Sequence, residues 1–447
     1  MPSINWILPE GSVLEFNGLS RPLKVLRGLG GGGQGHVFEV EVAGEHLALK
    51  WYFPNCLARD PYLPERLTES IRATAPNSNF LWPIALLRPT PASTAAIKLS
   101  EPGCGYLMGL RPSSFLGAIE HYAGRIEISL QNVLRAGFFL ADAFHSLHSK
   151  GLCYKDISLG NIFLEPDTGR ILICDNDNVD VDGRDLCGVL GTPGFIAPEV
   201  LMNRARPSTN TDLFSLAVLL FRLLTRHDPL KGQMDLEIQC LDEPARRHLY
   251  GEDPVFIFDP HDQRNQPNPV EHGAALITWP IYPPKLQSLF LQTFCDGMKD
   301  PKKRALTGQW KEILAKTIDH RVLCHQCGQE NFPDDPGKST PCWNCKNELT
   351  RSQTLRLANG VVTASPENKI YPHHFDNLKP PQLKDVVAQV VQHPSDPCIL
   401  GLKNLSEHSW SAILTNGTKT TVEAGKTCNL STLIQLLTPM GDVITTI

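Results

Sequence analysis

The chain has 447 residues, which is too many for one ordinary hydrophobic core, so two or three domains are expected. A charged fraction of 20 % and a hydrophobic fraction of 41 % are ordinary for a folded protein and argue against bulk disorder. The net charge of -5 provides no basic face for nucleic acid, and the longest apolar stretch, residues 213–224, is interrupted by Arg222. We therefore expect no nucleic-acid binding and no membrane insertion, and the scattered cysteines indicate reduced thiols and a cytoplasmic location.

A glycine-rich loop is the first motif along the chain. Residues 30–37 fit G-x-G-x-x-G-x-V, with Gly30, Gly32, Gly35 and Val37 at the fixed positions. The alternating residues that follow, up to position 51, predict a strand, a turn at 43–45 and a second strand. A dinucleotide-binding loop would open a helix, and a P-loop would end in Gly-Lys-Ser or Gly-Lys-Thr. A hairpin that covers ATP is the interpretation that remains.

Lys50 ends the second strand of this hairpin, and Leu47-Ala48-Leu49-Lys50 resembles the V-A-I-K strand of protein kinases. In that family the ammonium holds the α- and β-phosphates of ATP, so we assign Lys50 and Ala48 to the nucleotide site. A lysine at a strand edge would otherwise be an ordinary surface residue. The resemblance also implies a glutamate partner on a following helix. Glu65 and Glu69 lie four residues apart on one helical face, and the spacing to residues 80–82 favours Glu69.

A catalytic loop is expected after a helix over residues 130–149, whose apolar positions recur at helical spacing. Residues 154–161 resemble H-R-D-L-x-x-x-N, which implies that Asp156 accepts the proton of the substrate hydroxyl and that Asn161 binds Mg²⁺. Asp175 follows an apolar strand and stands where the D-F-G aspartate of the family chelates Mg²⁺. Each of these residues alone could be a turn residue, but their joint spacing favours the catalytic interpretation.

The segment after Asp175 resembles a kinase activation segment, and residues 191–199 end it with an intact A-P-E triplet. Thr192 matches the threonine that hydrogen-bonds the catalytic aspartate, and it is the only hydroxyl side chain between positions 175 and 199. The resemblance further implies an ion pair between Glu199 and Arg304 and a structural role for Asp212. The same segment is acidic, through Asp177, Asp180, Asp182 and Asp185. Two interpretations stay open: these carboxylates pair with basic groups such as Lys155, or they form a solvated acidic loop.

The resemblance is to eukaryotic-like (Hanks-type) Ser/Thr protein kinases and runs from about residue 20 to residue 320, with an insertion near 249–260 similar to that of some bacterial members. It implies an α+β, bilobal kinase fold over residues 1–320, with an N-lobe at about 1–110 and a C-lobe at about 111–320. It also implies ATP, Mg²⁺ or Mn²⁺, a protein substrate, and a companion phosphatase or adaptor protein.

Three departures from the family pattern leave a second hypothesis open. Tyr154-Lys155 replaces His-Arg, Ser158 replaces the usual lysine, and Asn176 replaces the phenylalanine of D-F-G. The alternative is a pseudokinase scaffold that binds nucleotide and organises partners, or a chain in which the C-terminal modules carry the main activity. Retention of Lys50 and of the residues at positions 156, 161 and 175 favours an active kinase.

Two C-x₂-C pairs follow the kinase-like region, at Cys324 and Cys327 and at Cys342 and Cys345. This spacing predicts a zinc ribbon over residues 321–350, in which four thiolates hold a structural Zn²⁺ in a closed site. Two disulfides are the competing interpretation, and the predicted reducing location disfavours them. The mixed charges of the segment disfavour nucleic-acid binding by the ribbon and favour contact with protein.

Short alternating runs separated by turns fill residues 351–447 and predict a small β-sandwich. Residues 404–406 and the rhythm of the strands faintly resemble a forkhead-associated domain. The Ser-x-x-His pattern with an upstream arginine, which would indicate phosphothreonine capture, is missing. We therefore interpret this region as a docking domain.

Overall fold

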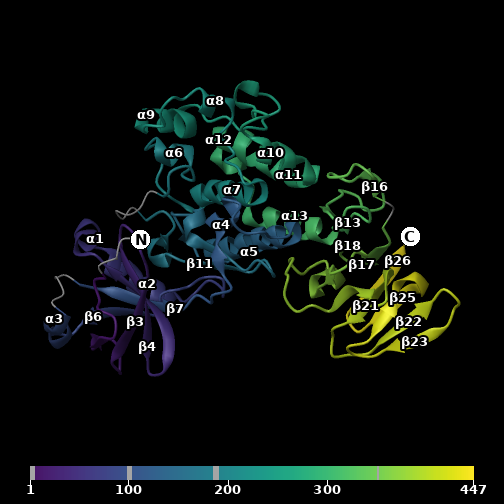
Figure 1. Ribbon diagram of the computed structural model, residues 1–447, viewed down its shortest axis with the longest axis horizontal. Coiled ribbons are helices and arrows are strands. Elements are labelled where there is room, and N and C mark those ends of the chain that lie inside the picture. The colour runs from purple at the N-terminus through teal and green to yellow at the C-terminus, as the bar shows by residue number, and fades with distance from the viewer. Residues whose placement is uncertain (1–5, 98–102, 185–190, 350–351, 447) are drawn as a thin grey trace.

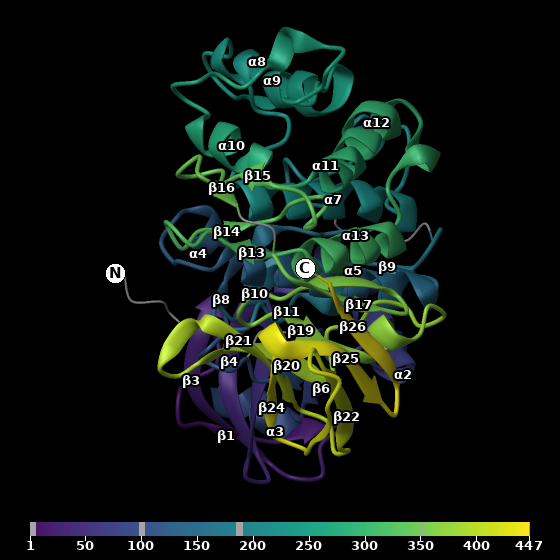
Figure 2. The same ribbon diagram turned by 90° about the vertical axis from the view of Figure 1, so that its right-hand side faces the viewer.

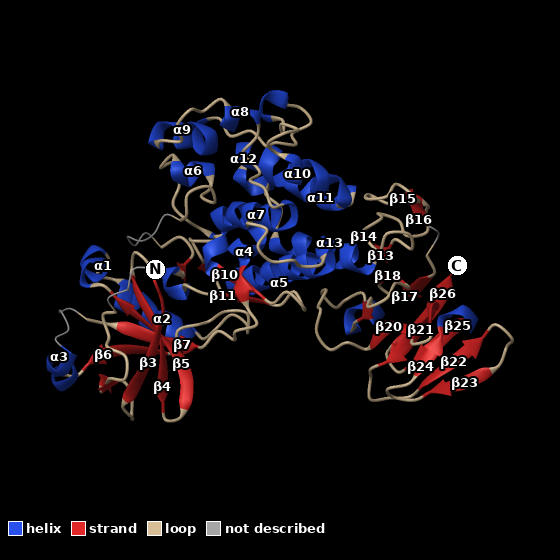
Figure 3. Cartoon of the chain, in the orientation of Figure 1, coloured by secondary structure: helices blue, strands red, loops and turns tan. Residues whose placement is uncertain are grey.

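The computed structural model describes residues 6–97, 103–184, 191–349 and 352–446. Figure 1 shows two regions rich in strands, one from each end of the chain, on either side of a helical body, and Figure 3 separates these parts by secondary structure. None of the described helices is long and apolar enough to cross a membrane.

The N-terminal region is built on a seven-stranded antiparallel sheet with the order β1-β3-β4-β5-β7-β6-β2. The alternation predicted for the hairpin after the glycine loop is confirmed, and Ala43 and Gly44 both have positive φ angles, of 53° and 87°, as a tight two-residue hairpin turn requires. The strands of this sheet are β1 (Val13–Leu14), β2 (Phe16–Asn17), β3 (Leu23–Gly31), β4 (Gly35–Val42), β5 (Glu45–Tyr52), β6 (Ala85–Pro89) and β7 (Gly105–Gly109).

Three helices accompany this sheet: α1 (Pro54–Arg59), α2 (Leu63–Ala73) and α3 (Pro91–Ile97). Helix α2 begins with a proline in its first turn, where a missing backbone N–H costs nothing. Leu63 and Leu67 of α2 belong to one buried cluster with Tyr106 and Met108 of β7. The helix therefore packs on the sheet with this apolar side, and this orientation decides which of its charged residues can reach the site.

The helical body is organised around α5 (Leu130–Ser149), α7 (Thr209–Thr225) and α13 (Thr307–Asp319). Helix α5 has the bounds that the apolar spacing predicts, and Ser129 caps it by accepting the backbone N–H of Asn132. Helix α7 is apolar on nearly all sides because it runs through the core. The other helices are α4 (Ala118–Tyr122), α6 (Pro198–Leu201), α8 (Gln233–Leu236), α9 (Glu243–Arg247), α10 (Gly273–Thr278), α11 (Pro284–Leu291) and α12 (Gly297–Lys299).

Short strands frame the loops of chemical interest within this body. Strand β8 (Leu116–Gly117) pairs with β10 (Ile162–Leu164), which pairs with β11 (Ile171–Ile173). Strand β9 (Leu152–Cys153) pairs with β12 (Asp180–Val181). The predicted catalytic loop thus runs from the end of β9 to the start of β10, and residues 174–178 leave the end of β11 beside it.

Residues 322–349 form two small hairpins, and each hairpin has one pair of cysteines in the turn between its strands. Their strands are β13 (Val322–Leu323), β14 (Glu330–Asn331), β15 (Thr340–Pro341) and β16 (Glu348–Leu349).

The C-terminal region contains two antiparallel sheets, of six strands in the order β18-β17-β26-β25-β22-β23 and of four in the order β19-β20-β21-β24. Both sheets contribute to one apolar cluster, for example through Leu436 of the first and Leu402 of the second. The strands are β17 (Thr354–Leu357), β18 (Gly360–Thr363), β19 (Lys369–Ile370), β20 (Ala388–His393), β21 (Asp396–Asn404), β22 (Trp410–Leu414), β23 (Lys419–Val422), β24 (Thr427–Asn429), β25 (Leu433–Thr438) and β26 (Gly441–Thr446).

The cysteine-rich segment and the C-terminal region are joined to the helical body by buried contacts. Phe332, Tyr371 and Leu383 belong to the same apolar cluster as α5, α7 and α13. Arg135 of α5 also donates to the Tyr371 hydroxyl, with an N to O distance of 2.9 Å. Figure 2 shows the C-terminal strands lying next to this body in a second view. These residues attach both parts to the helical body, while the C-terminal sheets keep an apolar cluster of their own.

Candidate active site

A cavity of about 920 Å³ lies between the N-terminal sheet and the helical body. The glycine loop forms one wall, residues 108–113 form another, and Asp156 and Asp175 form the floor. Of the nucleotide and catalytic residues that the sequence predicts up to position 175, all but Glu69 and Asn161 line it. Those that do are Gly30, Gly32, Gly35, Val37, Ala48, Lys50, Asp156 and Asp175.

The glycines of the loop have different reasons to be glycine. A Cβ on Gly35 would lie 2.0 Å from the carbonyl oxygen of Trp51, so close pairing of β4 with β5 requires a residue without a side chain. A Cβ on Gly30 or Gly32 would meet nothing within 4 Å. These two positions instead leave the space above the cavity open, so a ligand can approach the loop backbone.

Lys50 is buried at the back of the cavity with three oxygen partners. Its Nζ lies 2.8 Å from Asp177 Oδ2, 2.9 Å from Gln34 Oε1 and 3.3 Å from Asp175 Oδ1. The Tyr52 hydroxyl donates to the same Asp177 oxygen. Burial alone would lower the pKa of Lys50, but the two carboxylates outweigh it and raise that pKa above its ordinary value. The ammonium is therefore kept charged.

The predicted pairing of Lys50 with Glu69 is wrong. The Glu69 carboxylate lies 2.7 Å from an Arg184 guanidinium nitrogen and is 43 % exposed. Helix α2 buries Leu63, Arg66, Leu67 and Ser70, so its acidic residues lie off the face that packs toward Lys50. Spacing along the sequence placed Glu65 and Glu69 on one face but could not say which face packs inward.

Asp175 stands at a sharp turn in the chain. Its φ and ψ angles of 52° and 46° are left-handed, a conformation that non-glycine residues adopt rarely and often at functional sites. The next residue, Asn176, is fully buried and donates its amide to the carbonyls of Leu81 and Ile173, at 2.8 and 3.0 Å. Hydrogen bonds thus hold the side chain that replaces the phenylalanine of D-F-G.

Burial raises the pKa of Asp175, and the nearby carboxylates of Asp177 and Asp156 add to this effect while Lys50 opposes it. A second cation beside Asp175 would relieve the crowding of negative charge at this place. A divalent metal ion, which prefers oxygen ligands, fits this need.

Asp156 is held by two neighbours. The Thr192 hydroxyl donates to its Oδ1 at 2.6 Å, as the resemblance implies. The Asn161 amide donates to the backbone carbonyl of Asp156 at 2.9 Å and approaches its Oδ2 at 3.4 Å. Asn161 itself is buried and is not among the residues that line the cavity. These bonds fix the catalytic loop so that the Asp156 carboxylate faces the cavity.

The backbone of the loop is anchored from α7. Asp212 accepts the N–H groups of Tyr154 and Lys155, at 2.6 and 3.1 Å, which agrees with its expected structural role. The expected pairing of the acidic segment with Lys155 is also present, because Lys155 Nζ lies 2.8 Å from Asp180 and both side chains are buried. Asp182 bonds Thr209 at the start of α7, and Asp185 lies outside the described residues.

Arg304 and Glu199 form a bidentate pair, with distances of 2.7 and 2.8 Å. Arg304 is fully buried and also donates to the carbonyl of Gly297, so its charge is well satisfied. This pair, which the resemblance implies, joins the end of the activation segment to the loop before α13.

The four cysteines predicted to bind zinc come together in space. Their sulfur atoms all lie within 4.8 Å of one another, and Cys324 and Cys345 are 3.6 Å apart. The backbone N–H groups of Gly328 and Lys346 bond back to the carbonyls of Cys324 and Cys342, so each pair sits in a tight turn. Burial opposes ionisation of the Cys342 thiol, but the N–H groups of Cys345 and Asn344 outweigh it and lower its pKa to about 6. Four converging thiols of this kind suit tetrahedral Zn²⁺.

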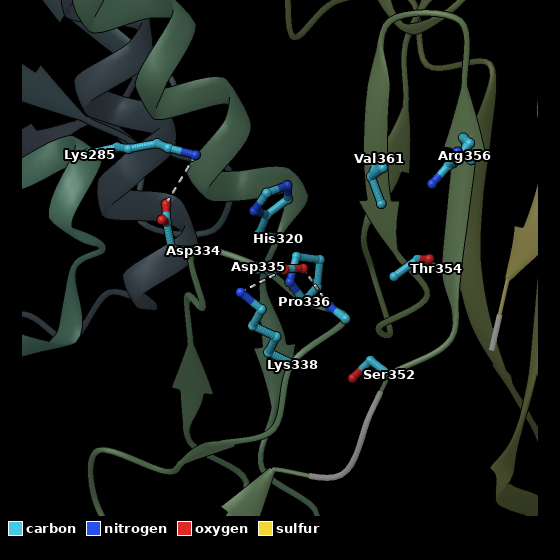
Figure 4. Close-up of a pocket in the computed structure, with 11 residues that line it drawn as sticks. Lys285, His320, Asp334, Asp335, Pro336, Lys338, Ser352, Thr354, Arg356 and Val361 are labelled. Atoms are coloured by element: carbon cyan, nitrogen blue, oxygen red, sulfur yellow. Dashed lines mark hydrogen bonds and ion pairs between the residues drawn. The ribbon is translucent and has the colours of Figure 1, made fainter.

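Two other polar clusters are less suited to ligands. Asp319, His373 and His374 gather in the core, but His374 Nδ1 accepts the backbone N–H of Tyr371, which leaves its Nε2 to donate to Asp319 at 3.2 Å. A pocket of about 520 Å³ beside the cysteine-rich segment, drawn in Figure 4, has its lysines paired with acids: Lys285 with Asp334 and Lys338 with Asp335. The histidine and the lysines named here are therefore already paired with groups of the protein.

Residues 121–317 match the family model of the protein kinase domain. The chain is 35 % identical over 122 residues to protein kinase C delta type of Mus musculus, covering 26 % of this chain and 17 % of that protein. It is 31 % identical over 169 residues to CBL-interacting protein kinase 4 of Oryza sativa subsp. japonica, covering 36 % of each. It is 27 % identical over 201 residues to the probable serine/threonine-protein kinase 2 of Plasmodium falciparum, covering 42 % and 37 %.

Residues 121–317 are thus similar to the protein kinase domain and to serine/threonine kinases, and the two-part architecture around the cavity supports a bilobal kinase fold. The chain spans between 17 % and 37 % of the lengths of these three relatives. The match to the family model begins at residue 121 and does not include the glycine loop or Lys50. The assignment of these residues to the site therefore depends on their position around the cavity.

Sequence reasoning missed Asp177 and Tyr52. Both touch Lys50 or its partner, although Asp177 is more than a hundred residues away in the sequence. The available signal was the second aspartate in Asp175-Asn176-Asp177, where the family has glycine. The sequence shows that Asp177 belongs to an acidic segment, but the turn at Asp175 decides that its side chain points toward Lys50.

Proposed function

We propose that this chain transfers the γ-phosphoryl group of ATP to a serine or threonine hydroxyl of a protein, with Mg²⁺ or Mn²⁺ as the metal ion. The observation that carries this proposal is that Lys50, Asp156 and Asp175, from three distant segments, line one cavity under a glycine loop. A phosphate-binding cation, a proton acceptor and a metal-binding carboxylate are the parts that phosphoryl transfer needs.

Lys50 binds the α- and β-phosphates in this proposal, and the neighbouring carboxylates keep it charged by raising its pKa against the effect of burial. The glycine loop covers the phosphates with backbone N–H groups. Gln34 of that loop now contacts Lys50, so a bound phosphate would take the place of its amide oxygen. Asp156 orients the substrate hydroxyl and accepts its proton, and Thr192 holds the carboxylate in the required direction.

Asp175 and Asn161 would hold the metal ion. Asp175 presents a partly exposed carboxylate to the cavity, and the crowding of acids around it favours a bound cation. Bound Mg²⁺ neutralises charge on the β- and γ-oxygens. Asn161, whose amide nitrogen donates to the backbone carbonyl of Asp156, is the second proposed ligand, as the resemblance implies.

The place of the usual loop lysine is taken by Ser158, and Lys155 is engaged with Asp180. Neither side chain therefore supplies a positive charge to the γ-phosphate. Transition-state charge falls on Lys50, on the metal ion and on backbone donors, so we expect slow turnover.

The experiment is transfer of labelled phosphate from ATP to the chain itself and to a generic basic protein, with Mg²⁺ or Mn²⁺. The Asp156→Asn and Asp175→Asn variants should each lose activity by about 100-fold or more. Asp167→Asn, a change of an exposed aspartate near the same loop, is the matched control and should keep wild-type activity. A wild-type protein that binds ATP but transfers nothing would favour the pseudokinase alternative.

Two further parts of the proposal concern the rest of the chain. We propose that the four cysteines bind one structural Zn²⁺, because the converging sulfurs leave no position for a reacting water. The domain division proposed is a kinase domain over 1–320, a zinc ribbon over 321–350 and a β-rich docking domain over 351–447. We propose a cytoplasmic location because the scattered cysteines indicate reduced thiols, and a companion phosphatase or adaptor because of the resemblance to bacterial kinases.

A further inference from the structure

Asp177 is the most deeply buried acid in contact with Lys50. The Lys50 and Asp177 side chains are 5 % and 1 % exposed, and their N to O distance is 2.8 Å, shorter than the 3.3 Å to Asp175. We propose that Asp177, oriented by Tyr52, is the positioning residue that holds Lys50 in the nucleotide site, in place of a glutamate from α2. This inference rests on the proposed function for what Lys50 does there.

The face of α2 that packs toward the site has no carboxylate to offer. Its buried residues are Leu63, Arg66, Leu67 and Ser70. The charged one, Arg66, is a cation that forms a buried pair with Asp60 and adds its positive charge to the surroundings of Asp177. Glu69 meanwhile is bound to Arg184. The cation thus stays on the strand, but its acidic partner comes from the loop instead of the helix.

The turn after Asp175 aims Asp177 at Lys50. Residues 176–178 form a short 3-10 helix, η2 (Asn176–Asn178), which reverses the chain directly after the left-handed Asp175. The two hydrogen bonds of Asn176 to Leu81 and Ile173 tie this turn to the body of the protein. The position of Asp177 is therefore set by the same turn that positions Asp175.

Tyr52 adds a hydrogen bond to the pair of Lys50 and Asp177. Its hydroxyl donates to the Asp177 oxygen that also faces Lys50, and Tyr52 and Lys50 lie two residues apart on β5, on the same face of the strand. The Lys50 ammonium and the Tyr52 hydroxyl therefore hold this one carboxylate oxygen together.

The position of Asp177 in the chain has a functional consequence. Because Asp175 and Asp177 lie on one turn, a single segment orients both the phosphate-binding ammonium and the metal-binding carboxylate. Helix α2 supplies no carboxylate to the pair of Lys50 and Asp177. Activity in this chain should therefore not depend on an ion pair between Lys50 and α2.

The test compares four variants of the full chain: Asp177→Asn, Tyr52→Phe, Glu69→Gln and Asp228→Asn. Asp228 is a matched control in the helical body, because it is buried, pairs with Arg222 and accepts the Tyr250 hydroxyl at 3.1 Å. It reproduces the cation, carboxylate and tyrosine arrangement away from the cavity. The measurements are kcat, the KM values for ATP and for the protein substrate, equilibrium binding of ATP with Mg²⁺, and the rate at which an amine-reactive reagent labels Lys50.

Asp177→Asn should lower kcat/KM for ATP by about 100-fold, weaken ATP binding and speed the labelling of Lys50, with the KM for the protein substrate unchanged. Tyr52→Phe, which is the milder change if Asp177→Asn fails to fold, should lower kcat/KM by about tenfold. Asp228→Asn should lower thermal stability without altering Lys50 labelling. Glu69→Gln should behave as wild type in every measurement.

The inference is overturned if Glu69→Gln reduces ATP binding and accelerates Lys50 labelling while Asp177→Asn and Tyr52→Phe do not. Labelling and ATP binding do not need phosphoryl transfer. A wild-type chain without transfer activity would therefore contradict the proposed function, while the labelling rates of the variants would still support or overturn the role of Asp177.

Discussion

Glu330 of the cysteine-rich segment accepts the backbone N–H of Gln131 in the first turn of α5, with an N to O distance of 3.0 Å. Its other oxygen lies 2.5 Å from Arg321, and all three residues are buried. A carboxylate at a helix N-terminus interacts favourably with the helix dipole. The cysteine-rich segment is therefore attached to the helix that leads to the catalytic loop.

Glu330→Gln keeps the size of this side chain and removes its charge. We expect a loss of about 3 kcal/mol in the free energy of unfolding, because the buried Arg321 guanidinium loses its counter-ion. Urea unfolding measures this. Glu348→Gln, at an exposed position of the same segment, should change stability by less than about 0.5 kcal/mol. Equal effects of the two variants would contradict a structural role for Glu330.

Purified protein should carry about one zinc ion per chain, and Cys342→Ser should lose it, because four thiolates close the site. Elemental analysis checks the metal. Hydrogen exchange should show lost protection in residues 322–349 and, through Glu330, in the first turn of α5. Cys398→Ser, which changes an exposed cysteine outside the cluster, should keep the metal and the protection. Full metal content in Cys342→Ser would argue against this ligand set.

Thr192→Ala should lower kcat by about tenfold or more, because the Asp156 carboxylate loses the hydroxyl that orients it. Thr192→Ser keeps the hydroxyl and should recover most of the rate. Steady-state kinetics at saturating ATP separate this effect from ATP binding, which both variants should retain. A Thr192→Ala enzyme with the wild-type kcat would show that Asp156 needs no such support.

Preincubation with ATP should leave the initial rate unchanged. Thr192 is the only hydroxyl side chain between positions 175 and 199, and it is already bonded to Asp156. Asp180 pairs with Lys155 without any modification, in the way that a phosphate would after modification. Mass spectrometry should therefore place any autophosphorylation outside residues 175–199. Stoichiometric phosphate on Thr192 together with a faster rate would contradict this prediction.

Stability should fall as the pH drops from about 6.5 to about 4 because of His373. Burial, with a smaller effect of His374, lowers the pKa of His373 to about 4. Across this window the unfolded chain binds a proton that the folded chain does not, so protonation favours unfolding, by at most roughly 3 kcal/mol. His373→Gln should flatten the pH dependence of the free energy of unfolding. His393→Gln, at an exposed histidine, should leave the dependence as in wild type.

Much of the site follows from residues that are close together in the sequence. Asp156 and Asn161 share one loop, Lys50 ends a strand directly after the glycine loop, and the cysteines come in two local pairs. Local spacing is enough for such groups because turns and strands fix the direction of neighbouring side chains. The bounds of α5 followed from apolar periodicity for the same reason.

Tertiary structure alone decided which acid meets Lys50. Periodicity placed Glu65 and Glu69 on one face of α2, but the contact of Leu63 and Leu67 with β7 turned that face away from the site. It also decided that Asp177, brought close by the turn at Asp175, lies against Lys50, and that Glu330 reaches Gln131. Contacts between residues more than a hundred positions apart depend on how packed elements are rotated against one another, and this information is not present in the local pattern of a single sequence.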